Sequence, residues 1–326
     1  MYKYILNRIF LMIPTLFGAG LLVFCLMRLV PGDICDVKLG GEGAAVSEEQ
    51  FEICRENAGL NRPVMLQFGD FMYGMVTLNP GDSMWTGKSI GHEISLRFQL
   101  TVQLAIMTTI VSVVIALPLG VISAVKQDSW IDYAVRSVAV AGVAVPSFWL
   151  GIMIILLLLI GTQHWLGHPW MPPIDYKPIW EDPAHNLSQL IWPAVATGYR
   201  TSAVITRMTR SAMLEVLRED YIRTARAKGL MEQVIRLRHA LLNAMLPVVT
   251  LIGIEFAFLI GGLVVTEQVF NLNGLGQLFV DSVGQHDYTL TQTLVMLVVF
   301  VHQSYLSSSL AFSLSKTKHN VSSHWP

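Results

Sequence analysis

Six apolar runs, separated by polar segments, set the pattern of this chain. The runs cover residues 9–30, 100–125, 133–161, 190–208, 244–265 and 290–312. Each is close to or above the length of about twenty residues that a helix needs to cross the hydrocarbon core of a bilayer. Because that core offers a backbone no hydrogen-bond partners, such spans are helical. The pattern predicts an all-α integral membrane protein with six transmembrane helices.

The composition agrees with this class and excludes a soluble globule. Of 326 residues, 53% are hydrophobic and 14% are charged, whereas about a quarter are charged in a typical soluble domain. The formal net charge of −1 gives no indication of a nucleic-acid partner. A signal peptide is the alternative reading of the first run, which follows Lys3 and Arg8. That run is too long, however, and no small-residue cleavage site closes it.

The loop charges predict which side of the membrane each segment occupies, because basic residues favour the cytoplasmic side. The segment 31–97 holds ten acidic and five basic residues and is placed outside. Lys126 and Arg136, which flank the short turn 128–132, place that turn inside. The stretch 207–247 and the C-terminal end are basic and are also placed inside. Both termini are therefore predicted to be cytoplasmic.

This orientation divides the chain into four parts. They are a cytoplasmic N-terminus with the first span (1–30), a small extracytoplasmic subdomain (31–97), a transmembrane domain with spans two to six (98–314), and a cytoplasmic tail (315–326). The transmembrane domain includes a cytoplasmic loop at 209–243.

The extracytoplasmic subdomain has its own structural signals. Ser47 and Gln50 have the spacing of a capping box and predict a helix over 47–60. Cys35 and Cys54 lie in the same segment, where an oxidising compartment would let them pair. The sequence does not show whether their Cα atoms come close enough to bond. A disulfide and two free thiols both stay open.

Two motifs resemble ligand sites but lack the residue spacing or the helical structure that such sites need. The segment 81–89 resembles a phosphate-binding loop, but five residues separate its glycines where the motif has four. His164 and His168 have the spacing that places two imidazoles on one helical face. Gly167 and Pro169 interrupt the helix that such a site needs. We therefore expect no nucleotide, metal or other cofactor in this chain.

The stretch 207–247 is the one long charged and helix-forming passage between two very apolar runs. Acidic residues at 219 and 220 come first, and basic residues at 226 and 228 precede Gly229. Acid first, base last and a glycine at the end predict a short helix of about two turns. The spacing of residues 214, 217, 221 and 225 places them along one helical face.

This amphipathic stretch has two readings. Its arginines suit a helix that lies on an anionic lipid surface. Its small residues Ala225, Ala227 and Gly229 suit close insertion into a groove of a partner protein. Composition alone leaves both readings open.

Glu255 lies near the middle of the fifth apolar run. An acid at that depth is costly and is by default a functional hypothesis. One reading is a carboxylate that lines a translocation path, and the other is a structural partner for a polar group on a neighbouring helix.

A resemblance to a known family comes from motifs spread over most of the chain. The segment 219–230, EDYIRTARAKGL, together with 239–241 and 243–247, resembles the EAA loop of binding-protein-dependent ABC importer permeases. Within that family it is similar to the peptide branch, the dipeptide and oligopeptide permease B subunits. The segments 28–33 (RLVPGD), 207–216, 266–270 (TEQVF), 274–276 and 287–288 resemble the family's patterns in the same order. The resemblance covers roughly residues 1–300, and the usual family ending is absent after it.

The resemblance implies a fold, an assembly and a location. The fold is that of a type I ABC importer permease in the bacterial cytoplasmic (inner) membrane, surrounded by membrane lipid. The implied partners are a second homologous permease, two cytoplasmic ATPases that bind ATP and Mg, an extracytoplasmic substrate-binding protein and a dipeptide or oligopeptide substrate. The chain itself would be a non-catalytic subunit that forms half of the translocation path. The residues that would couple it to an ATPase are Glu219, Asp220, Tyr221, Arg223, Thr224, Ala225, Arg226, Ala227, Lys228 and Gly229.

Other functions remain as alternatives. The same architecture carries other solutes, among them nickel chelates, haem and antibiotics. An intramembrane enzyme would need Glu255, Arg200 and the outer histidines to meet at one depth. An ATP-independent carrier would leave the cytoplasmic loop without a partner.

Overall fold

A computed structural model describes residues 2–40 and 47–322, and side chains within this part from residue 7 to 305 except at residue 9. The chain divides into two compact units, one formed by Met1–Gln99 with Asn273–Pro326 and the other by Leu100–Leu272. The predicted subdomain at 31–97 falls inside the first unit, together with the first and last helices. The regular elements described in both units are helices, as the apolar pattern predicts.

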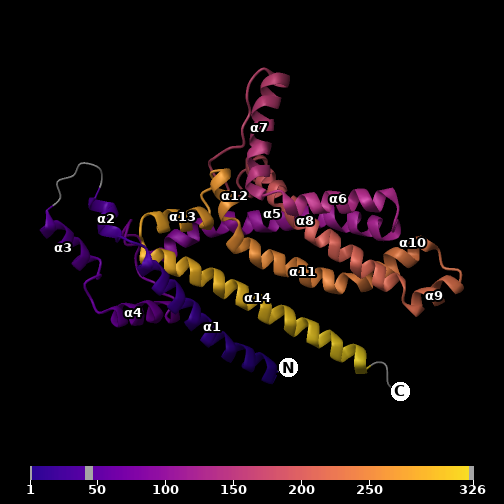
Figure 1. Ribbon diagram of the computed structural model, residues 1–326, viewed down its shortest axis with the longest axis horizontal. Coiled ribbons are helices and arrows are strands. Elements are labelled where there is room, and N and C mark those ends of the chain that lie inside the picture. The colour runs from indigo at the N-terminus through magenta and orange to yellow at the C-terminus, as the bar shows by residue number, and fades with distance from the viewer. Residues whose placement is uncertain (1, 41–46, 323–326) are drawn as a thin grey trace. The chain divides into compact units, whose positions relative to one another are not determined.

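The first unit is built around two long helices that lie side by side, α1 and α14 (Figure 1). Its helices are α1 (Tyr2–Leu29), α2 (Ile34–Leu39), α3 (Glu48–Asn57), α4 (Val64–Val76), the beginning of α5 (Ile90–Val125), α13 (Leu275–Gly284) and α14 (Tyr288–Ser322). Its apolar core gathers Ile90 with leucines of α13 and α14. A second cluster joins Val23 and Met27 of α1 to Tyr288.

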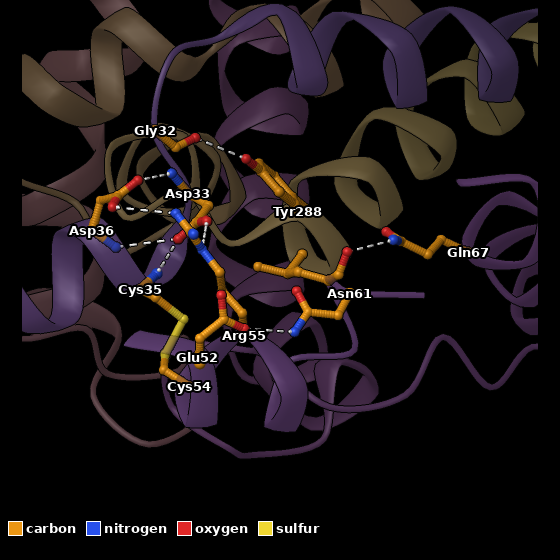
Figure 2. A network of polar contacts seen from close by, with 11 residues as sticks. Gly32, Asp33, Cys35, Asp36, Glu52, Cys54, Arg55, Asn61, Gln67 and Tyr288 are labelled. Carbon is orange, nitrogen blue, oxygen red and sulfur yellow. Dashed lines mark hydrogen bonds and ion pairs between the residues drawn. A yellow bond between two sulfur atoms is a disulfide. The ribbon is translucent and has the colours of Figure 1, made fainter. Parts of the chain in front are cut away.

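A network of polar contacts holds together the segment that follows α1 (Figure 2). Asp33 caps α2 by accepting hydrogen bonds from the backbone of residues 35 and 36, and its other oxygen pairs with Arg55 of α3 at 2.8 Å. The structure joins Cys35 to Cys54 in a disulfide, which links α2 to α3. The capping box predicted at Ser47 is present, and the helix it begins is α3.

The second unit is organised around α8, which lies against α6, α7 and α11 (Figure 1). Its elements are the rest of α5, α6 (Trp130–Ala144), α7 (Ser147–Leu166), α8 (Pro183–Leu217), α9 (Asp220–Ala227), α10 (Glu232–Val234), the π-helical segment η1 (Ile235–Ala240), α11 (Leu241–Gly262) and α12 (Val264–Val269).

Small residues bring α5 and α8 into close contact. A Cβ atom added at Gly120 would lie 2.6 Å from the Cβ of Thr209 and 3.0 Å from the carbonyl oxygen of Thr206. Nearer the N-terminal ends of the same two helices, Ser112 of α5 donates a hydrogen bond to the carbonyl oxygen of Gly198 of α8 at 3.0 Å. Close backbone approach through small residues is a common way for helices to associate in a membrane, where apolar burial offers no driving force.

Within the described residues, four helical stretches are long and apolar enough to cross a membrane. They are Phe10–Leu29, Ile90–Val125, Ser147–Leu166 and Glu232–Gly262. The helices α8 and α14, which contain the predicted fourth and sixth spans, have 35 residues each but are more polar. In α8 many of these polar residues are buried against other helices, among them Gln189, Thr197, Thr201, Thr206 and Thr209.

The prediction of one continuous span over 133–161 is wrong, because the chain breaks into α6 and α7 at Pro146. Proline has no backbone N–H and disfavours helical geometry at the residue before it. Val145 accordingly has an extended conformation, with φ −81° and ψ 122°, and α7 begins directly after the proline. The candidate span is shifted to Ser147–Leu166.

The end of the chain also differs from the expected division. The helix α14 continues to Ser322, so the backbone shows no boundary between a span that ends at residue 312 and a tail that begins at 315. The last four residues of the predicted tail, 323–326, lie outside the described residues.

The contact between α5 and α8 leads to a stability prediction. We expect Gly120→Ala to destabilise the protein by about 1–3 kcal/mol, because the added methyl group has no room against Thr209. The measurement is the thermal unfolding midpoint of the detergent-purified protein. Gly161→Ala is the matched control, since Gly161 lies within α7 and a Cβ atom there meets open space. Equal midpoints for the two variants would contradict the close contact.

Candidate functional site

The charged stretch after α8 forms the short helix that the sequence predicts. The helix α9 has eight residues, with Asp220 in its first turn and Arg226 in its last, where each charge complements the helix dipole. It ends at Ala227, and Gly229, which follows the C-cap residue Lys228, has a φ of +75° in the left-handed region. The N–H groups of Leu230 and Gly229 donate to the carbonyl oxygens of Ala225 and Arg226, at 3.3 and 3.0 Å. These two bonds make a Schellman motif, the common helix end that favours glycine.

One side of α9 is anchored in the apolar core of the second unit. Ile222 is fully buried and Ala225 is 8% exposed. They belong to a cluster that also includes Met213 of α8, Ile235 of η1 and Val248 of α11. The two-turn helix is therefore attached to both of the long helices that flank it.

The face predicted from residues 214, 217, 221 and 225 is wrong in part. The helix α8 ends at Leu217, so the break before α9 resets the helical period between the two halves of that set. Tyr221 is 42% exposed, and Ile222 takes the buried position beside Ala225.

The other side of α9 is polar and open. Exposed side chains there come from Tyr221, Arg223, Thr224, Arg226, Ala227 and Lys228, with Glu219 and Asp220 at the start of the helix. Arg223 and Asp220 form an ion pair at 3.3 Å, although both remain largely exposed. A Cβ atom at Gly229 would meet open space. Of the ten residues predicted to couple this chain to a partner, only Ala225 is buried.

Polar contacts brace α9 against the chain that returns to the membrane. Arg226 pairs with Glu232 of α10 at 2.8 Å, and Arg236 of η1 approaches the same carboxylate at 3.5 Å. The hydroxyl of Tyr221 accepts a hydrogen bond from the amide of Asn243, at 2.9 Å. Exposed ion pairs contribute little to stability, so we assign these contacts to orientation rather than to anchoring.

A buried ion pair lies just before this site, and the sequence reasoning missed it. Asp132, at the start of α6, is fully buried and accepts two hydrogen bonds from Arg210 of α8, at 2.8 and 2.7 Å. The Arg210 guanidinium, together with hydrogen bonds from Ser123 and the backbone of Asp128, holds the pKa of the Asp132 carboxyl well below its usual range. The pair fixes the turn between α5 and α6 to the end of α8. The one sequence signal was an acid three residues after Ser129, which caps α6.

Two acids in the second unit have different surroundings. Glu255 of α11 is half-buried. Its proposed place on a translocation path stays a prediction. Glu267 of α12, within the TEQVF segment, is fully buried and accepts a hydrogen bond from Thr101 at 2.7 Å. This acid holds α12 against α5, a contact that the TEQVF motif alone does not indicate.

The fold and the site define a class, a helical membrane protein that presents an anchored two-turn helix between two of its long helices. The chain matches the family described as "Binding-protein-dependent transport system inner membrane component" over residues 116–315 and that family's N-terminal part over residues 1–111. The glutathione transport system permease protein GsiC of Escherichia coli is 37% identical over 297 residues, which cover 91% of this chain and 92% of that protein. The GsiC protein of Pectobacterium atrosepticum is 36% identical over the same length. The chain belongs to the family of inner membrane permease subunits of binding-protein-dependent ABC importers.

The fold comparison agrees with this family. A structure of the inward-facing MetNI methionine ABC transporter matches 68% of this chain and 95% of its own chain, with a TM-score of 0.52 and 19% identity. The predicted type I permease fold is confirmed. The expectation that the resemblance ends near residue 300 needs correction, because the family match runs to residue 315.

The buried ion pair gives a pH-dependent prediction. A lowered pKa means that Asp132 stabilises the fold above the unfolded value of about 3.9, and that this contribution is lost as the pH falls below it. Arg210→Met leaves a buried carboxylate without its cation, which costs about 3–5 kcal/mol at neutral pH. The variant should then gain stability when the pH is lowered from 7 to 5, because protonation removes the uncompensated charge.

Thermal unfolding in detergent over this pH range measures the effect. Arg218→Met, at an exposed arginine of the same region, is the control and should leave the midpoint nearly unchanged. Asp132→Asn combined with Arg210→Met should remove the pH dependence. A single Arg210→Met variant with the stability and pH profile of the unaltered protein would contradict the role of the pair.

Proposed function

We propose that this chain is half of the translocation path of an ATP-driven importer for dipeptides or oligopeptides, and that α9 is the element through which a cytoplasmic ATPase drives it. The assembly contains a second homologous permease, two ATPases that bind ATP and Mg, and an extracytoplasmic substrate-binding protein. The chain lies in a bacterial inner membrane with both termini in the cytoplasm. It carries no catalytic group of its own.

The single observation that carries the proposal is the two-sided character of α9. Ile222 and Ala225 are packed into the cluster that joins α8, η1 and α11. The opposite face offers Arg223, Thr224 and Lys228 to solvent. A helix that is bound to the spans on one side and open on the other can pass the displacement of a docked partner to the spans as rigid-body motion.

The lipid-surface alternative for this helix is less consistent with the same geometry. A helix that lies on a membrane buries large apolar side chains in the lipid and keeps its charges at the rim. In α9 the large aliphatic side chain, Ile222, is already buried in protein, and apart from Tyr221 the exposed side chains are polar or small. That face suits a protein groove better than acyl chains.

The relatives support the class of solute. The GsiC proteins are permeases of glutathione transport systems, and glutathione is a short peptide with a free amine and two carboxylates. A peptide-sized solute is therefore the proposed cargo of this chain, ahead of nickel chelates, haem or antibiotics. Glu255, at mid-span on α11, is the proposed carboxylate on the path, where it would meet the solute's amine.

The test uses the tagged chain purified from its native membrane with whatever subunits accompany it. We expect a second permease and ATPase subunits to co-purify, and the reconstituted complex to take up short peptides with ATP and the binding protein present. Arg223→Glu should abolish uptake and leave the amount of chain in the membrane unchanged, because it reverses a charge on the open face of α9 without touching its buried side.

Lys126→Glu is the matched control. Lys126 is an exposed cation outside α9, in the turn between α5 and α6 and on the same predicted side of the membrane. Its uptake should equal that of the unaltered complex. Uptake by the chain alone without ATP, or normal uptake by Arg223→Glu, would overturn the proposal.

A further inference from the structure

The helix α4 is apolar on both of its faces, which is unusual for a segment expected to lie in water. Of its 13 residues, Gln67 and Asp70 are the ones with strongly polar side chains. Met65, Leu66, Tyr73 and Val76 share one face and are 80%, 54%, 72% and 79% exposed. A helix on the surface of a soluble subdomain has a polar outer face, whereas a helix that is apolar all round is buried in protein or in a membrane.

The opposite face of α4 rests on the middle of the first span. The Phe68 ring lies 5.7 Å from the Phe17 ring and 5.0 Å from the Phe24 ring, measured between centroids. Close to this ring cluster, a Cβ atom added at Gly20 would lie 2.9 Å from the sulfur of Met72. The two helices are therefore in direct contact around Gly20.

These contacts set the depth of α4. The apolar span of α1 is Phe10–Leu29, a stretch of 20 residues, and Gly20 lies nine residues before its end. At about 1.5 Å per residue, Gly20 is about 14 Å inside the span. A helix that touches α1 there is surrounded by hydrocarbon wherever it is not covered by protein. With 13 residues, α4 is too short to cross a core of about 30 Å, and this length is typical of interfacial or re-entrant segments.

The two strongly polar side chains of α4, Gln67 and Asp70, have partners, as a position in lipid requires. Gln67 accepts a hydrogen bond from Arg28, at the end of the first span. Its amide nitrogen donates to the carbonyl oxygens of residues 60 and 62, at 3.0 and 2.7 Å. Figure 2 shows Gln67 beside the network that contains the disulfide. Asp70 pairs with Arg62 at 2.7 Å.

We propose that α4 is a membrane-inserted helix in the leaflet at the Leu29 end of α1, and that its exposed face contacts lipid acyl chains. The exposed side chains of α1 around this depth, such as Leu21 and Leu22, are also aliphatic. Only part of the segment 31–97 then lies in water. The insertion fixes the height of the disulfide-linked helices α2 and α3 above the membrane, because Gln67 and Arg28 tie α4 to the chain on either side of them.

The experiment measures the surroundings of α4 in the complex reconstituted into phosphatidylcholine and phosphatidylglycerol vesicles. In a Cys25→Ser background, a nitroxide label is attached in turn to Met65→Cys, Tyr73→Cys and Val76→Cys, without reductant so that Cys35 and Cys54 stay bonded. Paramagnetic relaxation by oxygen, which concentrates in lipid, is compared with relaxation by a water-soluble nickel chelate. Leu22→Cys on α1 is the lipid control, and Glu49→Cys, an exposed position of α3, is the water control.

We expect the three α4 positions to relax strongly with oxygen and to lose the nickel effect, as Leu22→Cys does. Strong nickel relaxation, as at Glu49→Cys, would place the face in water and overturn the proposal. Weak relaxation by both reagents would mean that a protein subunit covers the face, which overturns it as well. Three labelled positions guard against one locally perturbed variant, and the readout does not depend on which solute is transported.

Discussion

A polar helix inside a membrane protein has to cover its polar groups with protein, and this constraint falls on α8. Gln189, Thr197 and Thr209 are buried, and Gly198 accepts a hydrogen bond from Ser112 of α5. The neighbouring helices α5, α6, α7 and α11 supply the cover, and small residues such as Gly120 let the backbones approach. The consequence is that α8 does not move alone: displacing it exposes several polar groups to lipid at once.

The packing of α8 also holds α9, the proposed coupling site, in a fixed position. Arg210, near the end of α8, is held by the buried carboxylate of Asp132, so the turn between α5 and α6 moves with α8. A few residues further on, Ile222 fixes α9 to the cluster shared by α8, η1 and α11. A partner that pulls on the open face of α9 therefore acts on two long helices together, which is what a rigid-body mechanism requires.

The sequence predicted the parts whose signals are local. The start and end of α9 follow from its charges and from Gly229, and α3 follows from the capping box at Ser47. It failed where distant segments meet: Asp132 and Arg210 are 78 positions apart, and no local pattern connects them. It also failed where a break resets a helical period, as between α8 and α9. It did not predict the helix α4, whose 13 residues are too few for a span.

The central claim is that the open face of α9 touches an ATPase subunit, and photo-crosslinking tests it most directly. A photoreactive amino acid is introduced at Thr224 on the open face of α9, and separately at Lys126 in the turn after α5, in the complex purified from its native membrane. The account predicts a covalent adduct between this chain and one ATPase subunit from position 224 and none from position 126. Crosslinking of position 224 to lipid alone, or equal adducts from both positions, would contradict it.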